Sequence, residues 1–220
     1  IGGIWSASNG NATVVSGVVT GITAGTDIIS YTVSNSCGTA SATKVITVNP
    51  LSNPGTISGS ASVCVGSTLS LTNAASGGIW SASNSNASVA GGVVTGISAG
   101  VCTISYSVTN LCGTQAATKP ITINALPNAG AITGSASVCL GASITLAENV
   151  GGGIWSASNG NASVLGGVVT GHSAGTCTIS YSVSNMCGTN VATKTININP
   201  LPDAGLINGA NEVCEGETIT

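Results

Sequence analysis

The strongest constraint on this chain is a segment that returns at a fixed interval. The heptapeptide GIWSASN occupies residues 3–9, 78–84 and 153–159, so its copies lie 75 residues apart. A unit of this length is a small domain, since solenoid repeats have about 20–45 residues. The chain is therefore predicted to be a tandem array: the later part of one repeat at residues 1–50, complete repeats at 51–125 and 126–200, and the opening strands of a further repeat at 201–220.

Each repeat is predicted to be all-β. Residues 102–109, CTISYSVT, alternate apolar with hydroxyl side chains, as a strand with one buried face does. Glycine-rich runs separate such segments, and no stretch carries a helical period. Six or seven short strands per repeat indicate tandem immunoglobulin-like β-sandwiches arranged as beads on a string. Prolines gather at the repeat boundaries and are expected to stiffen them: Pro50, Pro54, Pro127, Pro200 and Pro202.

One tryptophan and one tyrosine recur in each repeat. The regular place of the tryptophans on a central strand predicts core packing, and stacking on sugars is the weaker alternative. The expected core markers are Trp5, Trp80, Trp155, Tyr31, Tyr106 and Tyr181.

The order of motifs in the second repeat resembles a known family. Residues 80–84 (WSASN), 92–97 (GVVTGI), 99–100 and 103–104 are similar to the group 2 bacterial immunoglobulin-like domain. Segments 62–66 and 110–114 resemble repeats in very long secreted surface proteins of gliding bacteria. The resemblance covers essentially the whole chain and implies a tandem array in a bacterial surface adhesin. It departs from the antibody pattern at Val108, which stands where a core cysteine would be, so it implies no antibody-type disulfide.

Charged residues are only 4% of the chain, against a usual figure of about 25%. Three lysines cannot neutralise a nucleic acid backbone, which excludes nucleic acid as a partner. No run of 18 or more apolar residues is present, so no membrane insertion is expected in this segment. Ile1 is not a natural start, and the chain is expected to be a mature piece or a fragment of a longer repeat array.

Eight cysteines in a chain poor in histidine and acids indicate disulfides and an oxidising, extracellular compartment. No CxxC pair occurs, which argues against zinc. The economical pairing is Cys64–Cys112 and Cys139–Cys187, with Cys37 and Cys214 as their equivalents in the partial repeats. A third, optional column holds Asp27, Cys102 and Cys177. Because Cys64 and Cys112 belong at opposite ends of a sandwich, two other pairings stay open: Cys64–Cys102, or a staple from Cys64 to Cys187 across the joint between consecutive repeats.

The residues that acid–base catalysis needs are missing from the middle of the chain. No Asp, Glu, His or Arg lies between Asp27 and Glu148, so no enzyme, cofactor or metal site is predicted. The lone His172 replaces an isoleucine of the other repeats and is attributed to drift. The lysines are expected to extend from a sheet edge to solvent. The acids near residue 220 are expected to be solvated rather than a calcium site: Asp203, Glu212, Glu215 and Glu217.

Two functions of different classes follow. The first is a structural segment of an extracellular bacterial surface fibre or adhesin stalk, which associates with neighbouring copies of itself or serves as a semi-rigid spacer. The alternative is an adhesin module whose loops bind a glycan or a host or surface receptor. The loops vary little between repeats, which counts against many specificities. Strand donation from residues 201–220 to a neighbouring copy is a further possible contact between copies.

Overall fold

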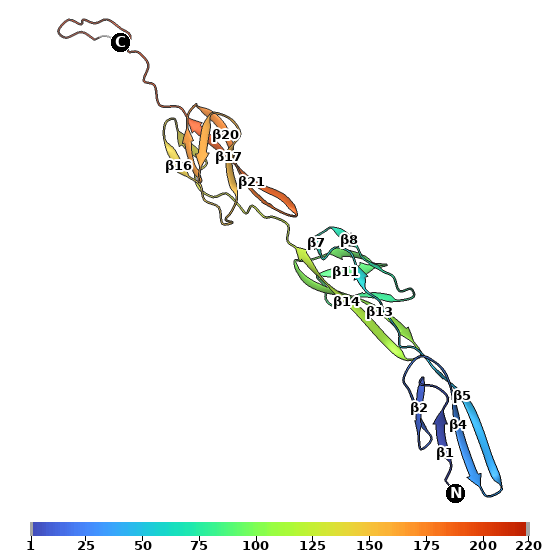
Figure 1. Ribbon diagram of the computed structural model, residues 1–220. Helices are drawn as coiled ribbons and strands as arrows, with labels where there is room; N and C mark the ends of the chain where they lie inside the picture. Colours follow the sequence, from blue (N-terminus) through green and yellow to red (C-terminus); the bar gives the residue numbers. More distant parts are fainter. Residues whose placement is uncertain (1, 219–220) are drawn as a thin grey trace. The chain divides into compact units, whose positions relative to one another are not determined.

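The computed structural model describes residues 2–218, and all regular structure in that range is β (Figure 1). The described residues contain no helix long and apolar enough to cross a membrane. The chain divides into two compact units, residues 1–125 and 126–220, and each is described by itself. Each repeat is therefore an all-β, immunoglobulin-like domain or part of one.

The longest element of every repeat is a two-stranded hairpin. In the second repeat it joins β13 (Gly100–Asn110) and β14 (Gly113–Asn124), which pair antiparallel along their whole length. Alternate residues of β13 are buried, because apolar and hydroxyl side chains alternate along it. Gly113 has φ +119°, a conformation that favours glycine, so it can close the two-residue turn after Asn110.

Two sheets form around this hairpin. The larger has the order β10-β13-β14-β7, in which β10 (Ile79–Ala82) runs antiparallel to β13 and β7 (Ser62–Cys64) runs parallel to β14. The smaller has the order β11-β12-β8. Its strands, and those of a short two-stranded ribbon, are β11 (Ala87–Ala90), β12 (Val93–Gly96), β8 (Thr68–Ser70), β6 (Ile57–Ser58) and β9 (Thr72–Asn73).

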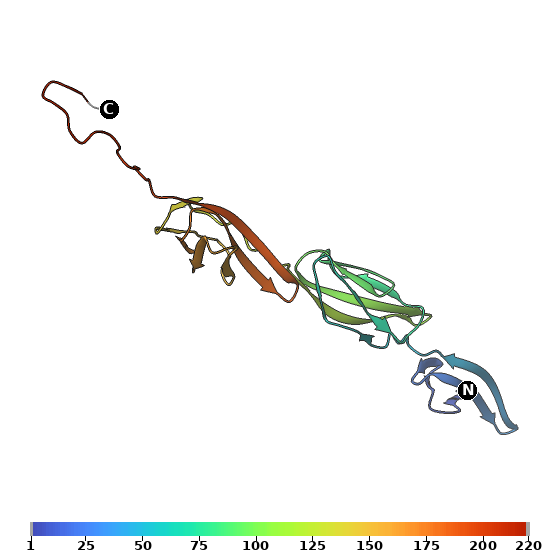
Figure 2. The ribbon, with the colours of Figure 1, turned by 90° about the horizontal axis from the view of Figure 1, so that it is seen from above.

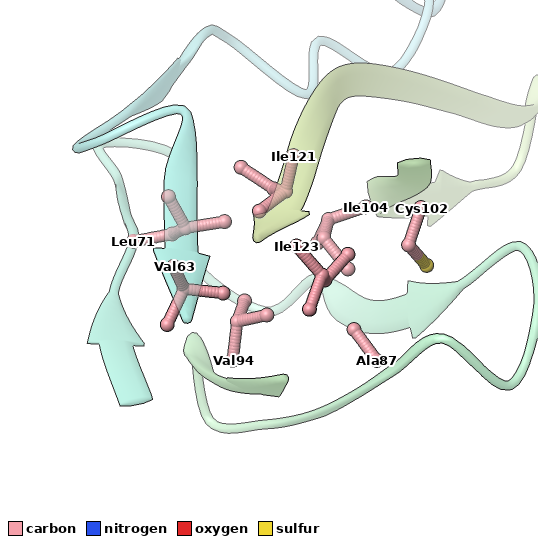
Figure 3. Packing of buried hydrophobic residues seen from close by; sticks show 8 residues of the cluster. All are labelled: Val63, Leu71, Ala87, Val94, Cys102, Ile104, Ile121 and Ile123. Atoms are coloured by element: carbon pink, nitrogen blue, oxygen red, sulfur yellow. The ribbon is translucent and has the colours of Figure 1, made fainter. Parts of the chain in front are cut away.

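The core of the second repeat lies between its two sheets. Isoleucines from the hairpin point toward valine and leucine from the opposite sheet and from the opening strands (Figure 3). Fully burying one such aliphatic side chain stabilises a fold by about 1.5–3 kcal/mol. The buried cluster is Val63, Leu71, Ala87, Val94, Cys102, Ile104, Ile121 and Ile123.

The third repeat has the same architecture. Its larger sheet has the order β15-β21-β20-β17 and its smaller sheet the order β16-β19-β18. The buried cluster is equivalent to that of the second repeat, residue by residue. Its strands are β15 (Ser137–Cys139), β16 (Ser143–Thr145), β17 (Ile154–Ala157), β18 (Ala162–Leu165), β19 (Val168–Gly171), β20 (Gly175–Asn185) and β21 (Gly188–Asn199).

The first repeat has the same body without opening strands. Its sheets have only the orders β1-β4-β5 and β2-β3. Val19, which is equivalent to the fully buried Val94, is 36% exposed because residues 1–220 hold no opening segment to cover it. Its strands are β1 (Ile4–Ala7), β2 (Ala12–Val15), β3 (Val18–Gly21), β4 (Gly25–Asn35) and β5 (Gly38–Val48).

The opening strands predicted at residues 201–220 are absent from the described part of that segment. Residues 201–218 run without a strand (Figure 2), and residues 219–220 lie outside the described range. The reason is the lack of a partner. In the second repeat the opening strand β7 is held by β14, and the described residues contain no strand that pairs in this way with segment 201–218. Val213 is accordingly 52% exposed, whereas its equivalents Val63 and Val138 are buried.

Candidate functional site

The aromatic pair of each repeat is part of the domain body. Trp80 lies on β10, which is an edge strand of the larger sheet and not the predicted central strand. It lies opposite Tyr106 on β13, with ring centroids 4.8 Å apart. The buried Tyr106 hydroxyl donates to the Ala75 carbonyl (2.7 Å) and accepts from the Gly78 amide (2.9 Å). A Cβ on Gly78 would lie 2.4 Å from the tyrosine ring, so the close approach requires glycine. The third repeat repeats this arrangement with Trp155 and Tyr181.

In the first repeat the same pair is more open. The centroids of Trp5 and Tyr31 lie 4.7 Å apart, and the Tyr31 hydroxyl accepts from the Gly3 amide (2.9 Å). Trp5 is 39% exposed, whereas Trp80 and Trp155 are half-buried and pack against the cores of their repeats. The aromatic rings therefore pack against each other across paired strands in every repeat.

Each repeat contains an Asn-Ala-Thr or Asn-Ala-Ser motif of the kind that accepts N-linked glycans, at residues 11–13, 86–88 and 161–163, and its asparagine helps to close a loop. The Asn86 side-chain amide donates to the Val101 carbonyl (3.4 Å), and the side-chain carbonyl of Asn84 accepts from the Asn86 backbone amide (3.0 Å). The other two repeats make the same bonds from Asn11 to Thr26 and from Asn161 to Thr176. The nitrogen that a glycan would modify is thus already engaged in the fold.

The third, optional column is a buried position with a distinct environment, and its role could not be read from the sequence. Asp27 is 1% exposed, and its carboxylate accepts hydrogen bonds from the backbone amides of Ser8 (2.9 Å), Asn9 (3.2 Å) and Ala12 (2.9 Å) and from the Ser8 hydroxyl (2.9 Å). Burial raises the pKa of Asp27, but these hydrogen bonds together bring that pKa below its usual value. Through these hydrogen bonds the carboxylate holds the loop between β1 and β2 in place.

Cysteine takes the same place in the other two repeats. Cys102 and Cys177 are fully buried in their cores and are free. The Cys102 thiol lies 3.8 Å from the Ser83 hydroxyl and 3.7 Å from the Asn84 carbonyl, so it makes weak contacts to the loop that Asp27 holds strongly. A thiol that an aspartate can replace within the same array is a packing residue.

Five of the remaining six cysteines lie at the ends of the folded repeats, and Cys214 lies in the segment without strands. Cys64 pairs in register with Asn124 and Cys139 with Asn199, where the last strand of each repeat ends. We call the column Cys64, Cys139 and Cys214 the exit cysteines. The other column lies at the turn of the long hairpin, where an asparagine side chain accepts from the cysteine amide at 2.7–2.8 Å in every repeat. We call Cys37, Cys112 and Cys187 the tip cysteines.

The economical pairings Cys64–Cys112 and Cys139–Cys187 are not formed. Cys112 and Cys139 are free and exposed. Within the second repeat, Cys64 lies beside one end of β14 and Cys112 beside the other, which places them roughly 35 Å apart along the strand. Disulfide-bonded residues have Cα atoms within about 7 Å, so this pairing cannot form in the folded repeat. Cys64–Cys102 is not formed either, because Cys102 is free.

Cys64 and Cys187 are each in a disulfide, whereas the other six cysteines are free. The disulfide-bonded residues thus comprise one exit cysteine and one tip cysteine.

The ionisable residues singled out in the sequence are scattered. His172 is exposed, and its Nε2 lies 2.8 Å from the Ser163 hydroxyl. Lys119 and Lys194 are half-buried on unbroken hairpin ladders, and Lys44 is exposed. Among residues 2–218, no three His, Cys, Asp or Glu side chains gather into a group that could hold a metal ion.

The hairpin turn of the first repeat borders a pocket of about 390 Å³, lined by Val33, Ser34, Asn35, Cys37, Gly38, Thr39 and Ala40. In the second repeat the equivalent turn contacts the segment that enters the repeat. The Asn110 side-chain amide donates to the Pro50 carbonyl (2.9 Å), and the buried Ser52 hydroxyl donates to the Gly113 carbonyl (3.1 Å). The pocket of the first repeat thus lies at the turn equivalent to the one that the entering segment contacts in the second repeat.

No protein family model matches the chain, and no curated protein matches it. Among solved structures it is similar to an I-band fragment of titin, at 14% identity and a TM-score of 0.42, with 90% of this chain and 87% of that one covered. It is also similar to a fragment of mouse protocadherin-24 (13% identity, TM-score 0.36, 90% of each chain).

A further similarity is to a SusE-like surface-located polysaccharide-binding protein from the heparin utilisation locus of Bacteroides thetaiotaomicron. The identity is 11% and the TM-score 0.29, with 89% of this chain covered, and the chain spans 54% of that protein's length. The immunoglobulin-like fold described above follows from the chain's own strand order and core.

Proposed function

We propose that the chain is a structural segment of an extracellular bacterial surface fibre or adhesin stalk, in which the repeats act as semi-rigid spacers or associate with other copies, without catalysis. The resemblance of the second repeat to the group 2 bacterial immunoglobulin-like domain supports this assignment.

One observation carries the proposal. Equivalent polar side chains in successive repeats make the same internal hydrogen bonds, at the Asn86 loop, at the Tyr106 hydroxyl and at the turn that precedes Cys112. The loops are therefore occupied with maintaining the domain. Side chains that serve binding would be expected to point outward and to differ from one repeat to the next.

The surface supports the same function. Nine charged residues in 220 leave little electrostatic repulsion to keep copies apart. Exposed apolar residues such as Ile79 (73%) and Ile154 (74%) stand at equivalent places on the edge strands β10 and β17. A periodic, weakly charged surface favours lateral or end-to-end association.

Glycan or receptor binding is the second candidate, and the pocket at the first hairpin turn is the observation that favours it. The equivalent turn of the second repeat contacts the chain itself through Pro50 and Ser52. Filling by a protein segment accounts for that pocket, and we therefore rank the binding function second.

Immunogold labelling of intact source bacteria with antibodies to residues 1–220 tests the proposal. We expect gold along extended surface or released fibres, at many positions per fibre. Label confined to the cell interior would contradict it. A glycan array probed with the purified chain tests the alternative: saturable binding that a substitution in the first hairpin turn removes would favour the adhesin module instead.

A further inference from the structure

The two columns of end cysteines point toward a joint between consecutive repeats. An exit cysteine lies beside the residue that ends the last strand, as Cys64 does beside Asn124. A tip cysteine lies at the hairpin turn that contacts the segment entering the repeat. One repeat therefore offers a thiol where the chain leaves it, and the next repeat offers one where the chain arrives.

The first joint, which lies within the unit of residues 1–125, shows what a tip cysteine meets. The Cys112 thiol lies 3.5 Å from the carbonyl oxygen of Asn49. Asn49 is the equivalent of Asn124, the residue that stands level with Cys64 in the second repeat. A tip cysteine thus contacts the residue beside which the exit cysteine of the preceding repeat belongs.

We propose that the exit cysteine of each repeat forms a disulfide with the tip cysteine of the next, so that every joint of the array carries a covalent bond beside the backbone. Residues 1–220 contain both partners of only one such joint, Cys64 and Cys187. These are the two disulfide-bonded cysteines of the chain. On the 75-residue period, the partners of Cys37, Cys112, Cys139 and Cys214 fall outside residues 1–220, and all four are free.

The proposal also accounts for the odd number of cysteines per repeat. The third cysteine, Cys102 or Cys177, is buried in the core, and Asp27 occupies the same position in the first repeat. A column that tolerates aspartate cannot be required for a bond. Each complete repeat therefore contributes one thiol to the joint before it and one to the joint after it.

Formation of the bond requires a two-electron oxidant, which we assign to the class of small-molecule or protein disulfides in an oxidising compartment. The thiolate of one cysteine attacks the donor disulfide and forms a mixed disulfide, releasing one thiol. The second thiolate attacks that mixed disulfide, forms the Cys64–Cys187 bond and releases the second thiol. The step rests on the proposed extracellular location, since a reducing cytosol would reverse it.

The test is disulfide mapping of the intact chain refolded with oxidised and reduced glutathione. Free thiols are alkylated in denaturant, and chymotryptic peptides are analysed by mass spectrometry without reduction. We expect one cross-linked pair that contains Cys64 and Cys187, with the other six cysteines alkylated. A link from Cys64 to Cys102 or Cys112, or alkylation of both Cys64 and Cys187, would overturn the proposal.

Two variants provide a matched comparison. Cys187→Ser should abolish the cross-link and leave Cys64 to be alkylated, whereas Cys102→Ser should leave the cross-link at its full yield. The wild-type map decides the matter even where a variant fails to fold. Failure of this map would leave the surface labelling unchanged, so the two proposals can fail separately.

Discussion

A carboxylate and a thiol occupy the same buried position in successive repeats. The Asp27 carboxylate accepts hydrogen bonds from three backbone amides and one hydroxyl. Cys102 makes only weak sulfur contacts to the equivalent loop of its own repeat. A charge can be buried there because its oxygens are fully hydrogen-bonded. The Asp27 carboxylate has a pKa below the usual value for aspartate, so its hold on the loop can be tested by acidification.

The loop held by Asp27 should open as the pH falls. A carboxyl whose pKa is lowered in the folded state stabilises that state above its unfolded value of about 3.9, and this contribution is lost as the pH falls through the lower folded pKa. We expect amide hydrogen exchange at residues 8–12, corrected for the intrinsic rate, to accelerate below about pH 4.

The same molecule contains the control. Residues 83–87 form the equivalent loop around Cys102 and should show no such acceleration, and Asp27→Cys should remove it from residues 8–12. Equal acceleration of exchange in the two loops, or acceleration that persists in the Asp27→Cys chain, would show that the carboxylate does not hold the loop in place.

At the level of strands, the opening segment seals the sandwich. The second repeat has β7 and β8 on its sheets and its Ile121 is fully buried, whereas in the first repeat, which has neither strand, Ile46 is half-buried. The hairpin, the aromatic pair and the short β2–β3 ribbon form without the opening strands. Those strands therefore supply closure of the core rather than the framework.

Truncating these two equivalent isoleucines should show how much the closed core adds to the stability of a repeat. Ile121→Ala should destabilise the second repeat by about 2–5 kcal/mol, since it leaves a cavity in a closed core. Ile46→Ala should cost the first repeat clearly less, because water already reaches that face. Hydrogen exchange of β13 and β4 under mild denaturant reports each repeat separately. Equal losses of unfolding free energy in the two repeats would mean that the opening strands do not close the core.

The strands were predictable because their signal is local and is present three times. Alternation in CTISYSVT indicates one buried face wherever it occurs, and the 75-residue period repeats it. The lack of strands at residues 201–218 was not predictable from the same pattern, since a strand exists only with a partner. The sequence did not reveal the hydrogen bonds to Asp27, because their three backbone amide donors come together only in the folded loop.

The cysteine pairing failed at sequence level for a related reason. Comparing equivalent positions of the repeats shows which cysteines recur. Which of them can pair depends on the end of the sandwich at which each cysteine lies. The parallel register of β7 on β14 places Cys64 at the exit end and thereby excludes Cys112 of the same repeat. Pairing between neighbouring repeats was one of the options that the sequence left open. The strand register excludes the competing pairing of Cys64 with Cys112 within one repeat.

For the whole molecule, the bond we propose changes how the chain carries tension. A disulfide between Cys64 and Cys187 bypasses 123 residues of backbone, so pulling on the two ends would leave most of the second and third repeats outside the path of force. In a longer array the bypasses would overlap, because the exit cysteine Cys139 precedes the tip cysteine Cys187 in sequence. A stalk built in this way would stay short even after its domains unfold.

Single-molecule stretching of the chain from its two ends would measure this directly. The fully extended length should be about 400 Å shorter in oxidising than in reducing buffer, at about 3.4 Å per bypassed residue. Cys187→Ser should restore the full length in oxidising buffer, and Cys102→Ser should not. A shortening of only about 160 Å would instead indicate a bond from Cys64 to Cys112, because that loop holds fewer residues. No difference between the two buffers would mean that the joints are held by packing alone.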